Sequence, residues 1–380
     1  MTPRHLGVNT LFYIPGGVGG TETFLRETLR ELLPLLPGRC TLFTNRDNDA
    51  ALRAFLADVP PPPGGVAFDL LDFSATSRVR RILREQTELP RRVRAAGCDA
   101  LWSPGYTACL RSPCPQAVTI HDMQYRRFPQ DLSPVAWLAT HLLVTLGVRR
   151  CGRVLAVSEF ARREIIHFTG CSPDKVVAAP NGVNGDYERA VPAVPVPVEK
   201  PFLLCVAGSY PHKNLPSLVR AFDDIADAIP HRLLLVGGPG RGEADLRKCI
   251  SSARHRDRIE RRAGLGPDEL HALYAAADLF VLPSLYEGFG LPVAEAELAG
   301  ALVLSTPCAS IPEVGGDAML TYDPEEEGAL AKAILSALAL DPAERRRRIE
   351  AGRAHARSFT WRQTAERTLD ALSKCAPQQP

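Results

Sequence analysis

The sequence predicts an α/β protein of two comparable domains, each with a parallel sheet between helices. Its 380 residues exceed the usual size of a single domain. An apolar run that leads into a turn containing glycine occurs near the start of each half, from residue 6 and again from residue 202. Between the halves, residues 191–201 carry alternating prolines, a composition typical of a semi-rigid extended linker.

Composition indicates an ordinary globular protein and excludes several classes. The chain is 45% hydrophobic and 23% charged with a net charge of +2, which argues against disorder and against nucleic acid as the main partner. Its ten cysteines form no Cys-x-x-Cys pair, so we expect small buried hydrophobes in a reducing cytoplasm and no metal site. No signal peptide or membrane-spanning run is evident, and we expect a cytoplasmic protein.

The first apolar run, residues 6–14, reads as a buried strand that leads into a glycine-rich turn and an amphipathic helix at residues 24–33. Gly17, Gly19 and Gly20 allow close approach of a ligand, and the helix N-terminus behind them favours anions. A dinucleotide site is the rival, but the third glycine of Gly-x-Gly-x-x-Gly is missing. A tight turn without a ligand is the other alternative.

His121 and Asp122 follow directly after the apolar run at residues 116–120. The carboxyl end of a parallel strand is where α/β sheets present functional groups. A His-Asp pair alone is more often a structural hydrogen-bonded pair, so the rest of the chain decides its role.

A pair of acids, Glu287 and Glu295, frames a glycine turn near residue 290. Residues 278–282 read as a strand, 283–290 as a loop, and a helix opens with Pro292 in its first turn. The predicted site residues here are Glu287, Gly288, Phe289, Gly290, Leu291 and Glu295. Such a strand, loop and helix suit a phosphorylated ligand, whereas two solvated acids near a helix N-terminus are the plainer alternative.

Glu287 and Glu295, with Gly-Phe-Gly-Leu-Pro between them, closely resemble the signature of the retaining glycosyltransferases of family 4. The resemblance implies the GT-B fold, two Rossmann-like α/β/α domains facing a deep cleft between them. We therefore expect an acceptor-side domain at residues 1–190, a linker at 191–201 and a nucleotide-sugar-binding domain at 202–358. Residues 359–380 are expected to form a helix that packs back on the first domain.

The same resemblance implies residue roles. His121 would lie near the transferred sugar, Glu287 would bind the sugar's hydroxyls, and Glu295 the nucleotide's ribose. The glycines of the first loop would face the donor's phosphates, and a second phosphate loop would comprise Gly208, Ser209, Lys213 and Asn214. Lys213 would supply a positive charge to the diphosphate, unless it is a plain surface lysine. Many relatives place an arginine where this chain has Ser209, and Arg241 is a possible substitute.

The implied activity is metal-independent, retaining transfer of a sugar from a nucleotide-sugar donor to a glycan, lipid-linked or small-molecule acceptor. Residues 119–129 look most like bacterial mannosyltransferases of polysaccharide assembly, which suggests GDP-mannose, while UDP- and dTDP-sugars stay open. A nucleotide-sugar epimerase and a non-catalytic nucleotide-sugar-binding subunit are the rivals of other classes. The basic segment at residues 78–94 raises peripheral membrane association, against which a solvated helix face is the favoured interpretation.

Overall fold

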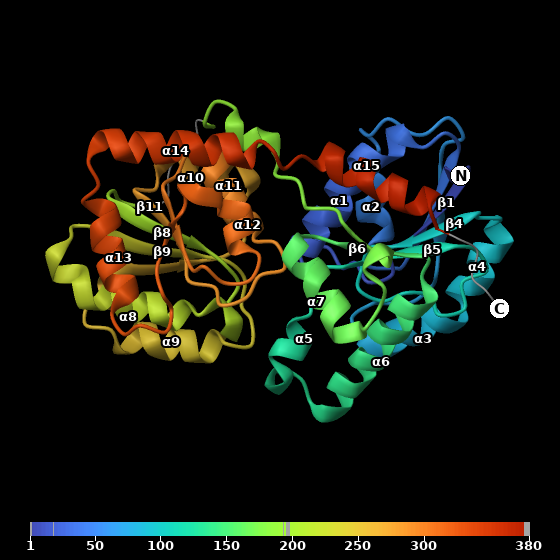
Figure 1. The fold of residues 1–380 in the computed structure, drawn as a ribbon, viewed down its shortest axis with the longest axis horizontal. Helices are drawn as coiled ribbons and strands as arrows, with labels where there is room; N and C mark the ends of the chain where they lie inside the picture. Colours follow the sequence, from blue (N-terminus) through green and yellow to red (C-terminus); the bar gives the residue numbers. More distant parts are fainter. Residues whose placement is uncertain (1, 18, 193, 195–197, 376–380) are drawn as a thin grey trace. The chain divides into compact units, whose positions relative to one another are not determined.

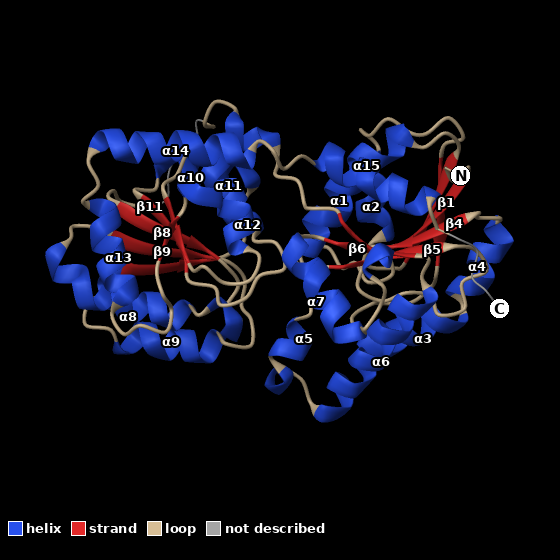
Figure 2. Cartoon of the chain, in the orientation of Figure 1, coloured by secondary structure: helices blue, strands red, loops and turns tan. Residues whose placement is uncertain are grey.

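The computed structural model describes residues 2–17, 19–192, 194 and 198–375. Within them the chain forms two compact units, Met1–Gly182 with Thr360–Pro380, and Val183–Phe359. Part of the predicted linker, at 193 and 195–197, and the last five residues lie outside the described residues. In each unit the strands lie between helices (Figures 1 and 2), and the predicted α/β class is confirmed.

The described part of the first unit contains a seven-stranded parallel sheet of order β3-β2-β1-β4-β5-β6-β7. The strands are β1 (His5–Asn9), β2 (Arg39–Thr44), β3 (Val66–Leu70), β4 (Ala100–Ser103), β5 (Gln116–Ile120), β6 (Arg153–Ala156) and β7 (Val176–Ala178). The helices are α1 (Gly20–Leu32), α2 (Asp49–Leu56), α3 (Arg78–Thr87), α4 (Leu89–Ala96), α5 (Gln124–Arg127), α6 (Pro134–Arg150), α7 (Glu159–Thr169) and α15 (Trp361–Ser373).

The second unit has a six-stranded parallel sheet of order β10-β9-β8-β11-β12-β13. Its strands are β8 (Phe202–Val206), β9 (Arg232–Val236), β10 (Ile259–Arg262), β11 (Leu279–Leu282), β12 (Val303–Ser305) and β13 (Leu320–Thr321). Its helices are α8 (Leu215–Ile225), α9 (Glu243–Ser252), α10 (Pro267–Ala276), α11 (Leu291–Ala299), α12 (Ile311–Gly315), α13 (Ala329–Leu338) and α14 (Pro342–Ala356).

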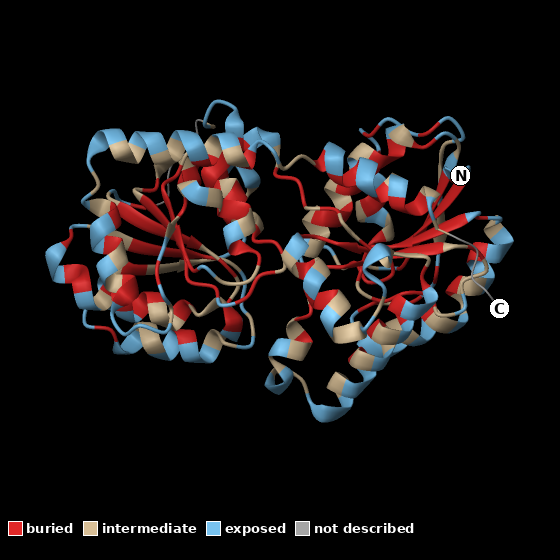
Figure 3. Ribbon diagram, viewed as in Figure 1, coloured by how far each residue is buried: buried red, intermediate tan, exposed pale blue. Residues whose placement is uncertain are grey.

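The central strands are buried along their whole length because helices cover both faces of each sheet. Every residue of β1, β5 and β11 is buried, as the red strands of Figure 3 show. Trp102 and Phe24 are among the largest buried side chains of the first unit, and Tyr274 and Phe280 among those of the second. Rigid sheets of this kind fix the position of the loops at the strand ends.

The chain leaves the first unit at Gly182, before the boundary expected at residue 190. The Val183 N–H donates to the Phe359 carbonyl at 3.0 Å, which holds both connecting segments side by side. Tyr187 then contacts the Tyr274 ring edge-on with centroids 5.6 Å apart, so its burial ties residues 183–188 to the second unit. The closing helix α15 belongs to the first unit, where it packs along α1.

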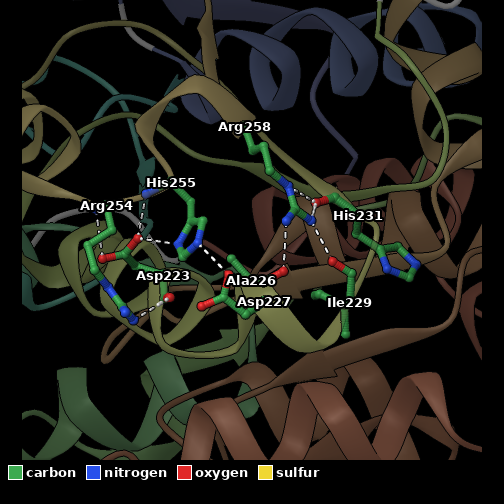
Figure 4. A network of polar contacts seen from close by, with 8 residues as sticks. All are labelled: Asp223, Ala226, Asp227, Ile229, His231, Arg254, His255 and Arg258. Atoms are coloured by element: carbon green, nitrogen blue, oxygen red, sulfur yellow. Dashed lines mark hydrogen bonds and ion pairs between the residues drawn. The ribbon is translucent and has the colours of Figure 1, made fainter.

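The guanidinium of Arg258 donates hydrogen bonds to backbone carbonyls just after α8 in the second unit (Figure 4). Arg258 donates hydrogen bonds to the carbonyls of Ala226 at 2.7 Å, Ile229 at 2.6 Å and His231 at 3.1 Å. Carbonyls at a helix end have no partner within the helix. Arg258 therefore supplies donors that the backbone of this connection lacks.

His255, beside this network, is expected to make the stability of the second unit depend on pH. Hydrogen bonds to Asp223 at 3.0 Å and Asp227 at 2.9 Å raise its pKa above the ordinary value of 6.5. The folded state then binds the proton more tightly, so the stabilisation is complete below pH 6.5 and is lost as the pH rises through the folded pKa. Thermal unfolding of His255→Gln should show its largest deficit relative to the unmodified protein at acidic pH. A deficit that stayed constant up to about pH 9 would contradict this role.

Among the helices that the structure describes, none is both long and apolar enough to cross a membrane.

Candidate functional site

The site residues predicted in the second half of the sequence gather at one end of the second sheet. β8 and β11 are neighbouring parallel strands, so the loops that follow them both start at the carboxyl ends of the strands, on the same side of the sheet. The Leu285 N–H donates to the His212 carbonyl at 2.8 Å and joins the two loops. This pairing brings Lys213 and Glu287 together across 74 positions of sequence.

Lys213 and Glu287 form a bidentate ion pair. The Lys213 Nζ lies 2.6 Å from both carboxylate oxygens of Glu287, and the two side chains are 19% and 9% exposed. Lys213 ends a short 3-10 turn, and Asn214 turns the chain into α8 with a left-handed φ of 52°. Because the pair is largely shielded from water, its charges interact more strongly than an exposed pair would.

The loop that carries Glu287 is held by Ser310, which caps α12 after the next strand along the sheet. The Ser310 hydroxyl lies within hydrogen-bond distance of the carbonyls of Glu287, at 2.9 Å, and Phe289, at 2.8 Å. Gly290 caps α11 with a φ of 101°, a conformation that a side chain would strain. These contacts fix the position of the Glu287 carboxylate before any ligand binds. Ser310 has no local sequence signal, since its role depends on the tertiary packing of the β12–α12 connection against the Glu287 loop.

Glu295 occupies the second turn of α11, as the position of Pro292 predicts. The hydroxyl of the fully buried Tyr274 donates to its Oε2 at 3.0 Å. Burial raises the pKa of Glu295 to about 7, although the Tyr274 hydrogen bond opposes the shift. Glu295 can therefore be protonated or ionised near neutral pH. Tyr274 is a site residue that sequence reasoning missed.

Ser209 is turned into the protein. Its hydroxyl donates to Glu243 at 2.6 Å and accepts from the Gly240 N–H at 2.7 Å, and only 2% of the residue is exposed. Its carbonyl accepts from the Gly242 N–H at 2.7 Å. Through these bonds Ser209 joins the two glycine loops of the unit, and its predicted contact with the donor stays a prediction. Gly240 lets the two loops approach, because a Cβ there would meet the Ser209 carbonyl oxygen at 2.7 Å, whereas a Cβ on Gly208 would meet the ring of Tyr210 in its own loop at 3.2 Å.

Arg261 brings a further positive charge to the second glycine loop. Its Nη2 donates to the Gly238 carbonyl at 3.0 Å and lies 3.5 Å from a Glu243 oxygen, while the side chain is 18% exposed. Arg241, the sequence-based substitute for the arginine expected at Ser209, lies exposed in the same loop. Sequence reasoning missed Arg261, and the signal that could have found it is a charged strand beside a glycine loop.

In the first unit, His121 is buried at the end of β5. Its Nε2 lies 2.8 Å from the Pro104 carbonyl, and the ring meets Phe24 of α1 edge-on with centroids 4.8 Å apart. Burial lowers the pKa of His121 below its ordinary value. A carbonyl can only accept, so Nε2 carries the proton of the neutral ring and Nδ1 is left as an acceptor. His121 is thus set to accept a hydroxyl hydrogen bond.

The loop that positions His121 has a strained backbone. Tyr106 has a φ of 76°, which is uncommon for a residue with a side chain, and its hydroxyl donates to Asp122. Asp122 also accepts from the Gln124 N–H at 2.8 Å. Asp122 is therefore a structural partner that holds residues 104–107 against residues 121–124.

The first glycine loop is exposed and lies at the N-terminus of α1. Gly19 caps the helix with a φ of 53°, Gly20 begins it, and Gly17 closes a turn onto the Ile14 carbonyl at 2.9 Å. Glu22, in the first turn, accepts from the Gly16 N–H at 2.7 Å. As predicted, the glycines form a turn in front of a helix N-terminus. The Glu22 carboxylate accepts the Gly16 N–H, one of the backbone donors that a bound anion would use.

The described residues offer no metal site, and a cavity lies away from the predicted site residues. Within the described ranges, no set of three or more His, Cys, Asp or Glu residues is placed to hold a metal ion, and all ten cysteines are free thiols. A cavity of about 440 Å³ lies between β12, β13 and α13, and none of the predicted site residues lines it.

Comparison with known proteins agrees with the pattern of the sequence. A model of Glycosyltransferase Family 4 matches residues 18–187, and one of Glycosyl transferases group 1 matches residues 186–355. The O-antigen chain mannosyltransferase B of Escherichia coli is 35% identical over 227 residues, which cover 57% of this chain and 59% of that protein. The serotype-specific mannosyltransferase WbdA of Escherichia coli is 28% identical over 239 residues, which cover 59% of this chain and 29% of WbdA.

In both relatives the matched part is less than two thirds of their own length. The structure of Anabaena HepE in complex with UDP and glucose superposes with a TM-score of 0.74 at 18% identity, covering 97% of this chain and 99% of that one. At 18% identity this similarity supports the fold alone. Since the two family models together span residues 18–355, the chain belongs to the group 1 glycosyltransferases of family 4.

Proposed function

We propose that the protein transfers mannose from GDP-mannose to a glycan, lipid-linked or small-molecule acceptor, with retention and without a bound divalent metal. The observation that carries the proposal is the Lys213–Glu287 pair at the strand ends, in the motif that defines the family resemblance. The names of the two Escherichia coli relatives support mannose as the sugar. Ten free thiols suit a reducing cytoplasm.

Lys213 and the backbone N–H groups would stabilise the departing nucleoside diphosphate. A donor's phosphates would compete with Glu287 for the ammonium of Lys213. Glu287 would then accept hydrogen bonds from hydroxyls of the sugar. In a site that excludes water, a preorganised positive charge acts where the leaving group's negative charge develops.

Glu295 is expected to make donor binding pH-dependent. Its pKa of about 7 leaves it mostly protonated at pH 6 and mostly ionised at pH 8. If ribose hydroxyls donate to the carboxylate, affinity rises with pH by up to about tenfold between those values. Titration calorimetry with GDP-mannose should show this rise, and Glu295→Gln should flatten it. A pH profile that is the same in both proteins would remove Glu295 from the ribose site.

A panel of nucleotide sugars tests the reaction. GDP-mannose should raise the melting temperature more than UDP- or dTDP-sugars, because a ligand that binds only the folded state stabilises it. Slow release of GDP with a free sugar should accompany binding, and a chelator should leave the rate unchanged. Conversion of the sugar while it stays attached to the nucleotide would indicate an epimerase. Binding without any turnover, with or without acceptors, would indicate a non-catalytic subunit.

A further inference from the structure

Exposed apolar side chains gather on two helices of the first unit. Among the described residues, eleven large apolar side chains are exposed, and six of them lie on α3 and α6. They are Val79, Leu83, Val135, Leu138, Leu142 and Leu146, with exposed fractions of 79%, 59%, 80%, 51%, 50% and 40%. The pale blue turns of α6 in Figure 3 mark this exposure along the helix.

The apolar residues of α6 form one continuous stripe. Their spacing of three, four and four residues places Val135, Leu138, Leu142 and Leu146 on the same side of a helix. The other side of α6 packs inward through Val144 and Val148. A helix that is apolar on both sides is normally covered on both sides.

α3 lies beside α6 and carries two further exposed apolar residues. The Arg78 Nη2 donates to the Thr140 hydroxyl of α6 at 2.7 Å, which places the two helices next to each other (Figure 1). Val79 and Leu83, one turn apart, are exposed. The inward side of α3 carries Glu85, which is buried and accepts from the Thr107 hydroxyl at 2.8 Å.

The charges around the stripe are basic. No acidic residue occurs in α6, which ends in the exposed Arg149 and Arg150. On α3, Arg80 and Arg84 are exposed, and its one acid, Glu85, is buried, while Arg84 pairs with Glu88 directly after the helix at 2.5 Å. The six apolar residues with Arg80, Arg84, Arg149 and Arg150 are called the α3–α6 face below.

We propose that the α3–α6 face docks on an anionic lipid surface. Leucine and valine side chains would enter the boundary between headgroups and acyl chains, while the arginines would meet lipid phosphates. A second copy of the chain is a poorer occupant, because two basic faces would repel each other. The inference goes beyond the proposed transfer reaction and does not depend on it.

Vesicle sedimentation without donor or acceptor tests the proposal. At low salt the protein should sediment with vesicles of phosphatidylglycerol and phosphatidylcholine but not with phosphatidylcholine alone. The double variant Arg80→Gln with Arg84→Gln should lower partitioning about 30-fold. Leu138→Gln with Leu142→Gln should lower it by about tenfold or more. All four side chains are exposed, so circular dichroism and thermal unfolding should match the unmodified protein.

A matched control lies in the second unit, where Leu335 is 37% exposed and Arg346 is exposed. Leu335→Gln with Arg346→Gln should sediment like the unmodified protein. Absence of vesicle binding, or an equal loss in this control, would overturn the proposal. Self-association that Leu138→Gln with Leu142→Gln abolishes, without vesicle binding, would overturn it too and assign the face to a second copy. Because no sugar is transferred in the assay, either failure leaves the transferase proposal untouched.

Discussion

Glu287→Gln and Lys213→Ala should each lower transfer from GDP-mannose by about two to three orders of magnitude. Removing one preorganised group that stabilises developing charge typically has an effect of about 10²–10³ in kcat. Lys213 is the candidate for the leaving diphosphate, so its loss should appear mainly in kcat. Glu287 would bind the sugar in both ground and transition states, so its loss should affect KM as well. Initial rates over a range of donor concentrations separate the two effects.

Stability must be measured alongside activity, because the two side chains form a 2.6 Å ion pair. Removing one partner of a fully buried pair costs about 3–5 kcal/mol. The cost here should be smaller, since 19% of the Lys213 side chain is exposed and water can reach the charge left behind. The double variant Lys213→Met with Glu287→Gln leaves no unpaired charge. It should therefore regain stability relative to Lys213→Ala while staying inactive.

Lys332 provides the matched control. It pairs with Glu326 at 3.1 Å, but the side chains are 73% and 60% exposed. An exposed pair of this kind contributes about 0–1 kcal/mol, so Lys332→Ala should keep both stability and transfer. If Lys213→Ala kept near-normal turnover, or if the double variant were active, the pair would be structural and the proposed donor site would have to move.

The parts of the fold that the sequence predicts are those with a strong local pattern. β8 and β11 consist only of apolar residues, β1 and β5 are mostly apolar and fully buried, and each of the four is followed by a recognisable loop. β3, β10 and β13 give no such signal. Each is an edge strand, and β10 consists of an isoleucine followed by three charged residues. Edge strands need less apolar surface, so hydrophobic periodicity does not report them.

In the candidate site, too, the residues with a local sequence pattern can be predicted and the others cannot. Glu287, Glu295, Lys213 and His121 can be found by sequence because each stands in a motif beside a strand end. Their partners cannot be found so, because Tyr274, Ser310 and Pro104 become neighbours only through tertiary structure. Ser209 shows the limit most clearly: its place in the loop is that of a donor ligand, yet its hydroxyl is used by Glu243 and Gly240.

The basic segment at residues 78–94 shows a second limit. On its own it favours a solvated helix face, because its apolar stripe is thin. The structure places α6 next to α3, and α6 supplies the apolar residues that the segment lacks. A surface formed by two helices that are separated by other elements in the sequence has no periodicity of its own to detect.

His121→Ala should lower kcat/KM by about tenfold to a hundredfold. The buried ring is fixed by its Nε2–H bond to the Pro104 carbonyl, and in the proposed reaction Nδ1 would accept a hydrogen bond from a hydroxyl of the transferred sugar. Losing one such hydrogen bond inside a protein, so that a buried partner is left unpaired, costs about 1–3 kcal/mol. Competition assays with deoxy-sugar donors should identify the hydroxyl, since the variant should no longer discriminate against the analogue that lacks it.

The pH dependence distinguishes an acceptor from an acid catalyst. Burial lowers the pKa of His121, so the ring is neutral above pH 6.5 and its ionisation should not shape the rate there. A rate that fell as the pH rose through neutrality in the unmodified protein, but not in His121→Ala, would instead require a protonated ring.

His5 is the control that separates chemistry from packing. It is a buried histidine of the same unit, hydrogen-bonded to Thr41 at 2.8 Å and to the Gly97 carbonyl at 3.1 Å. It is the first residue of β1 and so lies at the amino-terminal end of the parallel strands, whereas His121 follows the carboxyl end of β5. His5→Ala should lower the melting temperature while the folded fraction keeps its kcat/KM. An equal loss of transfer per folded molecule in both variants would make His121 a packing residue, because only a group that touches the sugar can change the rate without changing the fold.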